Sequence, residues 1–238
     1  MERMRLGILA RDEQLRLMLA QVAHEIRNPL GGLELFASAA ADTEYPTERA
    51  RLIKRVREEV SALNGIIGDF LTFARPIGPS RESNDIRPAI REALELVEAE
   101  LKSGGGSIEV DLPAMPLMAR VPEDHVKRVA LNLLRNAAQV SDRVFLKAEV
   151  RNGEAVLVVS DKGPGVPKDM RDRVFEPFVT DKEQGTGLGL AIVKKVAEAS
   201  GGRVELADPA ETNGVRGGEF RVYFGSLEDM SEAVTPTD

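Results

Sequence analysis

The residues best suited to chemistry begin with a histidine beside an acid. His24 and Glu25 are adjacent, and Asn28 follows within the run VAHEIRNPL. Residues four apart share one face of a helix, so His24 and Asn28 can face solvent together, with Glu25 on the adjoining flank. A neutral imidazole is a good nucleophile toward phosphorus, and a neighbouring carboxylate can polarise it or accept its proton. Taken alone, the pair is more typical of a solvated helix surface.

Two asparagines, Asn132 and Asn136, form a second candidate group. They lie four residues apart on one face of a predicted helix, and the leucines between them turn toward the core. An amide oxygen is a hard ligand that suits Mg²⁺, and it adds no negative charge beside a triphosphate. The alternative is a plain polar stripe on an amphipathic helix.

A third candidate group follows a β-rich run that ends in VVSDKGPGVP. Gly163 and Gly165 permit unusual backbone angles and the close approach of a flat ligand. Asp161 can accept a hydrogen bond from an exocyclic amine, such as that of adenine. The alternative is an ordinary turn after a strand.

A glycine-rich segment, TDKEQGTGLGL, leads into a predicted helix. Unpaired N–H groups and the positive end of a helix dipole attract phosphates, and Lys182 can add a charge. The segment is neither a Walker A loop nor a dinucleotide fingerprint, because it lacks Gly-Lys-Ser/Thr and its glycines merely alternate. Upstream, Phe175 and Phe178 are expected to anchor residues 166–184 as a lid.

The first 75 residues are expected to position His24 on one of two long antiparallel helices. Apolar residues recur at helical spacings on both sides of a polar turn at residues 42–46, where Pro46 blocks helix continuation. One such hairpin has a thin core, and pairing two of them would bury both apolar stripes in a four-helix bundle. The sequence therefore predicts a homodimer formed through residues 1–75.

A change of composition indicates a linker at residues 76–80 and a second domain at residues 81–225. The first 75 residues hold 11 basic and 11 acidic side chains, so the rest of the chain carries the whole net charge of −7. Helical patterns cover residues 86–103, 123–140 and 187–200. Strand-like runs cover residues 107–112, 116–121, 143–150, 154–160, 203–207 and 218–224, with a hairpin signal at Asn152-Gly153. The mixture predicts an α/β sandwich, an α+β class for the whole chain, and a disordered tail at residues 226–238.

Composition excludes several classes of protein. A net charge of −7 and few aromatic residues argue against a nucleic-acid partner. The lack of cysteine excludes disulfides and thiolate metal sites, and two histidines, His24 and His125, are too few for a multi-histidine site. No apolar run approaches the ~18–20 residues that span a bilayer. We expect the chain to be cytoplasmic and to contain no membrane segment. It could still be part of a longer protein that is tethered to a membrane.

The order of these motifs resembles the catalytic core of the bacterial two-component sensor histidine kinases, in particular the nitrogen-regulation-like subgroup. The chain holds His-Glu-x-x-Asn-Pro on a helical hairpin, then Asn-x-x-x-Asn, Asp-x-Gly-x-Gly, Phe-Glu-Pro-Phe and Gly-Thr-Gly-Leu-Gly-Leu. Gly217-Gly218 is similar to the last, weaker glycine box. The resemblance implies a dimerisation and histidine-phosphotransfer hairpin followed by a Bergerat-type (GHKL) ATP-binding domain.

The resemblance also implies roles for individual residues. His24 would be the phosphoacceptor, Glu25 the base or polarising group, and Asn28 the residue that orients water during dephosphorylation of the partner. Asn136 would bind Mg²⁺ with Asn132 close by. Asp161, with Gly163 and Gly165, would hold the adenine amino group. The phosphates of ATP would be covered by Thr180, Lys182, Gly185, Thr186, Gly187, Leu188 and Gly189.

The implied activity is ATP-dependent phosphorylation of His24 and transfer of the phosphoryl group to an aspartate of a separate response regulator receiver domain. An upstream sensor domain or sensor partner is a further expectation. One alternative is a Bergerat-fold ATPase, which Asn132 disfavours because those hydrolases place a glutamate there. Another is a non-catalytic dimeric phosphotransfer scaffold, which the intact glycine boxes disfavour.

Overall fold

The computed structural model describes residues 2–75, 77–78, 80, 82–102, 105–181, 186–207 and 217–225, apart from the side chains of residues 2–19 and 21. Tertiary contacts divide the chain into two compact units. The first is Met1–Arg75 with Thr180–Leu188, and the second is Pro76–Val179 with Gly189–Asp238. The predicted tail and the candidate residues Lys182 and Gly185 lie outside the described residues.

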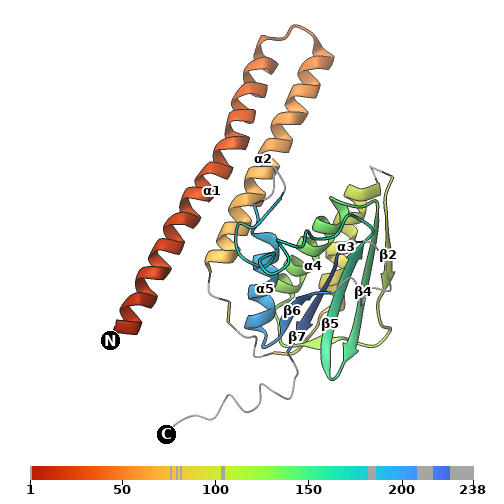
Figure 1. Cartoon of the computed structure of the whole chain (residues 1–238). Helices are drawn as coiled ribbons and strands as arrows, with labels where there is room; N and C mark the ends of the chain where they lie inside the picture. The colour runs from red at the N-terminus through yellow and green to blue at the C-terminus, as the bar shows by residue number, and fades with distance from the viewer. Residues whose placement is uncertain are drawn as a thin grey trace. The chain divides into compact units, whose positions relative to one another are not determined.

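The first unit contains the predicted helical hairpin (Figure 1). Its helices are α1 (Glu2–Asp42) and α2 (Pro46–Ala74). Pro46 occupies the first turn of α2, where its missing N–H costs no intrahelical hydrogen bond. Pro29 lies inside α1, which nevertheless continues as one helix to Asp42.

Arg49 of α2 closes the turn between the two helices. Its Nε donates a hydrogen bond to the carbonyl oxygen of Ala40 at 3.2 Å, and its Nη2 donates one to that of Thr43 at 2.6 Å. The last turn of α1 contains no basic residue of its own. Arg49 therefore supplies the positive charge that the carbonyl end of α1 favours.

The second unit is a five-stranded sheet whose one face is covered by helices (Figure 1). Across the sheet the strands are β2 (Ser107–Asp111), β4 (Arg143–Arg151), β5 (Glu154–Asp161), β7 (Glu219–Phe224) and β6 (Arg203–Leu206). Strands β2 and β4 are parallel, and the other neighbours are antiparallel. The helices are α3 (Arg87–Lys102), α4 (Glu123–Ala138) and α5 (Gly189–Ala199). The predicted α/β sandwich is thus confirmed.

Helix α4 and strand β5 form the centre of this core. The apolar residues of α4 recur three and four apart, and its buried residues are Val126, Val129, Ala130, Leu133, Leu134 and Ala137. All of residues 155–159 on β5 are buried, as expected for a central strand. Because both elements are tightly packed, they give fixed positions to the polar residues that they carry.

Two predicted details need correction, and one turn is as predicted. The strand expected at residues 116–121 is only β3 (Met118–Ala119), because Pro116 and Pro122 cannot donate to a ladder. It pairs with β1 (Asn84–Asp85), which lies outside the main sheet and whose polar residues gave no strand signal. The turn between β4 and β5 is formed by Asn152 and Gly153, both with positive φ.

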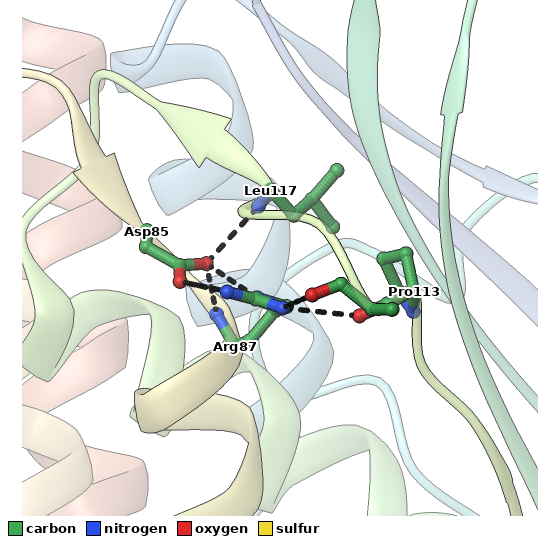
Figure 2. A network of polar contacts seen from close by, with 5 residues as sticks. Asp85, Arg87, Pro113 and Leu117 are labelled. Atoms are coloured by element: carbon green, nitrogen blue, oxygen red, sulfur yellow. Dashed lines mark hydrogen bonds and ion pairs between the residues drawn. The ribbon is translucent and has the colours of Figure 1, made fainter.

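A polar network holds the start of α3 against the loop that precedes β3 (Figure 2). Asp85 accepts hydrogen bonds from the backbone N–H groups of Arg87 at 3.2 Å and Leu117 at 3.1 Å. The Arg87 guanidinium pairs with the same carboxylate at 2.7 Å and donates to the carbonyl oxygen of Pro113 at 3.1 Å. Hydrogen bonds from Arg87 lower the pKa of Asp85 to about 2, despite its partial burial.

Candidate functional site

His24 and Asn28 lie on the exposed surface of α1, as the helical spacing predicts. The neighbouring residues Val22 and Pro29 are buried. An exposed imidazole on a helix can be reached by a second protein or domain. The geometry therefore leaves His24 available as a nucleophile, with an amide one helical turn away.

Glu25 differs from His24 because it is only half-exposed. Its Oε2 atom is buried and makes no hydrogen bond within the described part of the chain. Burial, together with the negative charge of Asp69 on α2, raises the pKa of Glu25 from 4.5 to about 7. A carboxylate with this pKa can accept a proton near neutral pH, which an ordinary surface glutamate does less effectively.

Asp161 lies at the end of β5 and is only 5% exposed. Its Oδ1 accepts hydrogen bonds from the N–H groups of Gly163 at 2.7 Å and Gly218 at 3.2 Å. The N–H of Asp161 in turn donates to the carbonyl oxygen of Gly218 at 3.0 Å. Two backbone segments thus hold the carboxylate in one orientation, which suits it to accept a hydrogen bond from a ligand.

Glycine is required around Asp161 for steric reasons. A Cβ on Gly217, which has φ of +150°, would lie 1.8 Å from the carbonyl oxygen of Asp161. A Cβ on Gly163 would lie 2.9 Å from the carbonyl oxygen of Val140, and Gly165 has φ of +74°. The resemblance singled out Gly217 and Gly218 as a weak glycine box and gave them no role in the site. Only the pairing of β5 with β7 brings them beside Asp161.

The two asparagines of α4 are both half-buried. The Nδ2 atom of Asn132 donates a hydrogen bond to the carbonyl oxygen of Gly189 at 3.3 Å, which connects α4 to the first residue of α5. Asn136 lies one turn further along α4 and offers an amide oxygen with the hard-ligand chemistry that Mg²⁺ prefers. In the described parts of the chain, no three His, Asp or Glu side chains could hold a metal ion together.

The glycine-rich segment is described from residue 186 onward. The N–H of Leu188 donates to the Oγ1 atom of Thr186 at 3.2 Å, Leu188 is fully buried, and Gly187 has φ of +60°. Helix α5 begins at Gly189, two residues later than predicted. Thr180, the first residue of the segment, is half-buried.

The two phenylalanines of the predicted lid have different surroundings. Phe175 packs edge to face on Phe220 of β7, with ring centroids 6.1 Å apart. Phe178 has φ of +65°, which is an unfavourable conformation for a bulky residue. Phe175 is thus anchored to the sheet, and the lid itself stays a prediction.

Comparison with known protein families assigns both units. Residues 14–78 match the His Kinase A (phospho-acceptor) domain. Residues 122–227 match the histidine kinase-, DNA gyrase B- and HSP90-like ATPase family. The first match contains His24, and the second contains Asp161 with α4, α5 and strands β4 to β7. None of the described helices is long and apolar enough to cross a membrane.

Individual relatives agree with these matches. Sporulation kinase D of Bacillus subtilis is 30% identical over 79% of this chain, and nitrogen regulation protein NtrY of Azorhizobium caulinodans is 33% identical over 82%. The chain spans only 38% and 27% of the lengths of these two relatives. The structure of full-length ShkA in complex with AMPPNP matches with a TM-score of 0.60 at 28% identity, covering 87% of this chain and 46% of that chain. This chain belongs to the histidine kinases and contains the catalytic core of their nitrogen-regulation-like subgroup.

Proposed function

We propose that the chain phosphorylates His24 with ATP and passes the phosphoryl group to an aspartate on the receiver domain of a separate response regulator. The observation that carries this proposal is the exposed imidazole of His24 within the region that matches the phospho-acceptor family. The carboxylate of Asp161, oriented by Gly163 and Gly218 in the ATPase region, supports ATP as the donor.

In the proposed reaction, a ring nitrogen of His24 forms a bond to the γ-phosphorus of ATP in line with the leaving group. The bond between that phosphorus and the β,γ-bridging oxygen breaks, and ADP leaves. Glu25, with its pKa of about 7, accepts the imidazole proton. Asp161 holds the adenine amino group, and Asn132 keeps α4 and α5 in register. Mg²⁺, bound through Asn136 and the phosphates, would neutralise the charge that develops on ADP.

We also propose that the active form is a homodimer formed through α1 and α2. Large aliphatic side chains of α1 and α2 remain 40–65% exposed in the described part of a single hairpin, and they are Leu30, Leu35, Ile53, Val60, Ile67 and Leu71. A second hairpin would cover them in a four-helix bundle. Sedimentation should show a dimer at micromolar concentration, and a monomer there would contradict this part of the proposal.

The phosphorylation step is tested by incubating the purified chain with Mg²⁺ and γ-labelled ATP, beside a His24→Gln variant. The expected label is acid-labile, base-stable and absent from the variant. Label of equal amount in the variant would show that another residue accepts the phosphoryl group. A wild-type chain that binds ATP and acquires no label would contradict autophosphorylation by this core.

A further inference from the structure

Ser141 lies between the two parts of the proposed nucleotide site in the sandwich unit. Helix α4 ends at Ala138, and β4 begins at Arg143. The N–H of Ser141 donates to the carbonyl oxygen of Ala137 at 3.0 Å, so the residue is fixed to the end of α4. Its half-buried side chain also forms a hydrogen bond with Lys162, which lies outside the connection between α4 and β4.

The Ser141 hydroxyl makes three hydrogen bonds. It donates to the carbonyl oxygen of Arg143 at 2.9 Å and accepts from the N–H of Arg143 at 3.1 Å. It also accepts from the N–H of Lys162 at 3.3 Å, which is 21 residues away and follows Asp161 directly. One donated and two accepted bonds use the full capacity of a hydroxyl, so its orientation is fixed.

The loop that begins at Asp161 lies close to the end of α4. A Cβ on Gly163 would lie 2.9 Å from the carbonyl oxygen of Val140, so this close approach requires glycine. The loop cannot move away without breaking the hydrogen bond from Lys162 to Ser141. The bond to Ser141 therefore limits the distance between α4 and the loop.

We propose that Ser141 is a positioning residue for ATP, which holds Asp161 at the correct distance from Asn136. This inference rests on the proposed function, in which Asp161 binds the adenine and Asn136 lies at the phosphate end. A nucleotide must contact both ends at once. If the Asp161 loop is mobile, nucleotide binding loses free energy because the loop must become ordered. The interaction of Asp161 with the adenine amino group then weakens.

The consequence is a loss of affinity rather than of chemistry. No step of the proposed reaction uses Ser141, so its loss should weaken ATP binding in ground state and transition state alike. Such a change raises the KM for ATP and leaves kcat unchanged. Loss of one hydrogen bond corresponds to a change of about three- to tenfold. Preference for ATP over GTP should fall as well, since Asp161 distinguishes the two bases.

Three variants of the whole chain test this inference. Ser141→Ala removes the hydroxyl, and Ser141→Thr retains it. Ser80→Ala is a matched control, because the half-buried Ser80 makes the same local bonds to Glu82, donating to its carbonyl oxygen at 2.9 Å and accepting from its N–H at 3.3 Å. We expect Ser141→Ala alone to raise the ATP dissociation constant in calorimetry and the KM of autophosphorylation.

The outcomes separate this inference from the proposed function. If Ser141→Ala matches Ser80→Ala in ATP affinity while the wild type binds ATP, the positioning role is wrong and the kinase assignment stands. If kcat and the melting temperature fall along with affinity and Ser141→Thr does not restore them, Ser141 is merely structural. If the wild-type chain binds no ATP at millimolar concentration, the proposed function itself fails.

Discussion

The pKa of Glu25 on α1 is raised to about 7 by its burial and by the negative charge of Asp69 on α2. The two helices of the hairpin thus share control of the group beside His24. A glutamate on a free helix would be fully ionised at neutral pH. Here the protonated and ionised forms coexist near neutral pH.

The first prediction concerns pH. Glu25 must be ionised to accept a proton, so the autophosphorylation rate should rise with pH through about 7. Asp69→Asn removes a charge that raises the pKa of Glu25. The rise of the rate with pH should therefore shift to lower pH, by on the order of half a pH unit. The exposed Glu95 serves as control, since Glu95→Gln should leave the profile unchanged. An unchanged pH dependence of the rate in Asp69→Asn would contradict the effect of Asp69 on the pKa of Glu25.

Ionisation of Glu25 should also affect stability, in the direction opposite to its effect on the autophosphorylation rate. The folded pKa of Glu25 lies above its unfolded value of 4.5, so ionisation opposes folding and the free energy of unfolding falls between pH 4.5 and about 7. Above that range Glu25→Gln should be more stable than the wild type by about 1–2 kcal/mol, after allowance for solvent around the half-buried side chain. Urea titrations at pH 5 and pH 8 measure the difference. A variant less stable at pH 8 would refute the explanation.

The second prediction concerns Asn28, which is exposed one turn beyond His24. Asn28→Ala should mainly slow dephosphorylation of the response regulator, because the proposed role of the amide is to orient water. His24 phosphorylation should change less than about twofold, since no step of that reaction uses Asn28. The lifetime of a phosphorylated receiver domain with each variant gives the answer. An unchanged lifetime would exclude this role.

The third prediction concerns Gly217. An alanine there would place its Cβ 1.8 Å from the carbonyl oxygen of Asp161, so β7 or the Asp161 loop must shift. Affinity for ATP should fall by at least about tenfold, since Asp161 loses its fixed orientation. Gly78→Ala is a suitable control, because nothing lies within 4 Å of its Cβ direction. Equal ATP affinity in the two variants would show that Gly217 is not part of the site.

The fourth prediction concerns the network in Figure 2. The folded pKa of Asp85 lies below its unfolded value of 3.8, so its stabilisation is present above that pH and is lost as pH falls through about 2. At neutral pH, Asp85→Ala should lower the free energy of unfolding by about 2 kcal/mol. Glu98→Ala, which breaks an exposed pair with Lys102, should cost no more than about 0.5 kcal/mol. Similar losses in both variants would contradict the importance of the network.

Local patterns in the sequence were sufficient to predict the hairpin and most of the sandwich. The two helices on either side of the turn at Pro46 follow from the spacing of apolar residues, and the structure contains both. The Asn152-Gly153 turn likewise depends only on adjacent residues, and it is present. The pairing of β1 with β3 was missed, because Asn84 and Asp85 have no strand propensity and are held by Arg87 and Leu117.

The site could be predicted only as residue types along the chain. The spacing of His24 and Asn28 predicts their shared exposed face, which follows from one helix. Glu25 is half-buried because α2 packs beside it. The hydrogen bond from Gly218 to Asp161 joins residues 57 apart in the sequence and depends on the pairing of β5 with β7. Contacts of this kind have no local signal.

The most direct test of the central claim is to locate the phosphoryl group. The chain is incubated with ATP and Mg²⁺, digested at neutral to basic pH, and analysed by mass spectrometry. We expect one phosphoryl group, on the peptide that contains His24. A phosphoryl group on the peptide with His125, the only other histidine of the chain, or on a serine or threonine would contradict it.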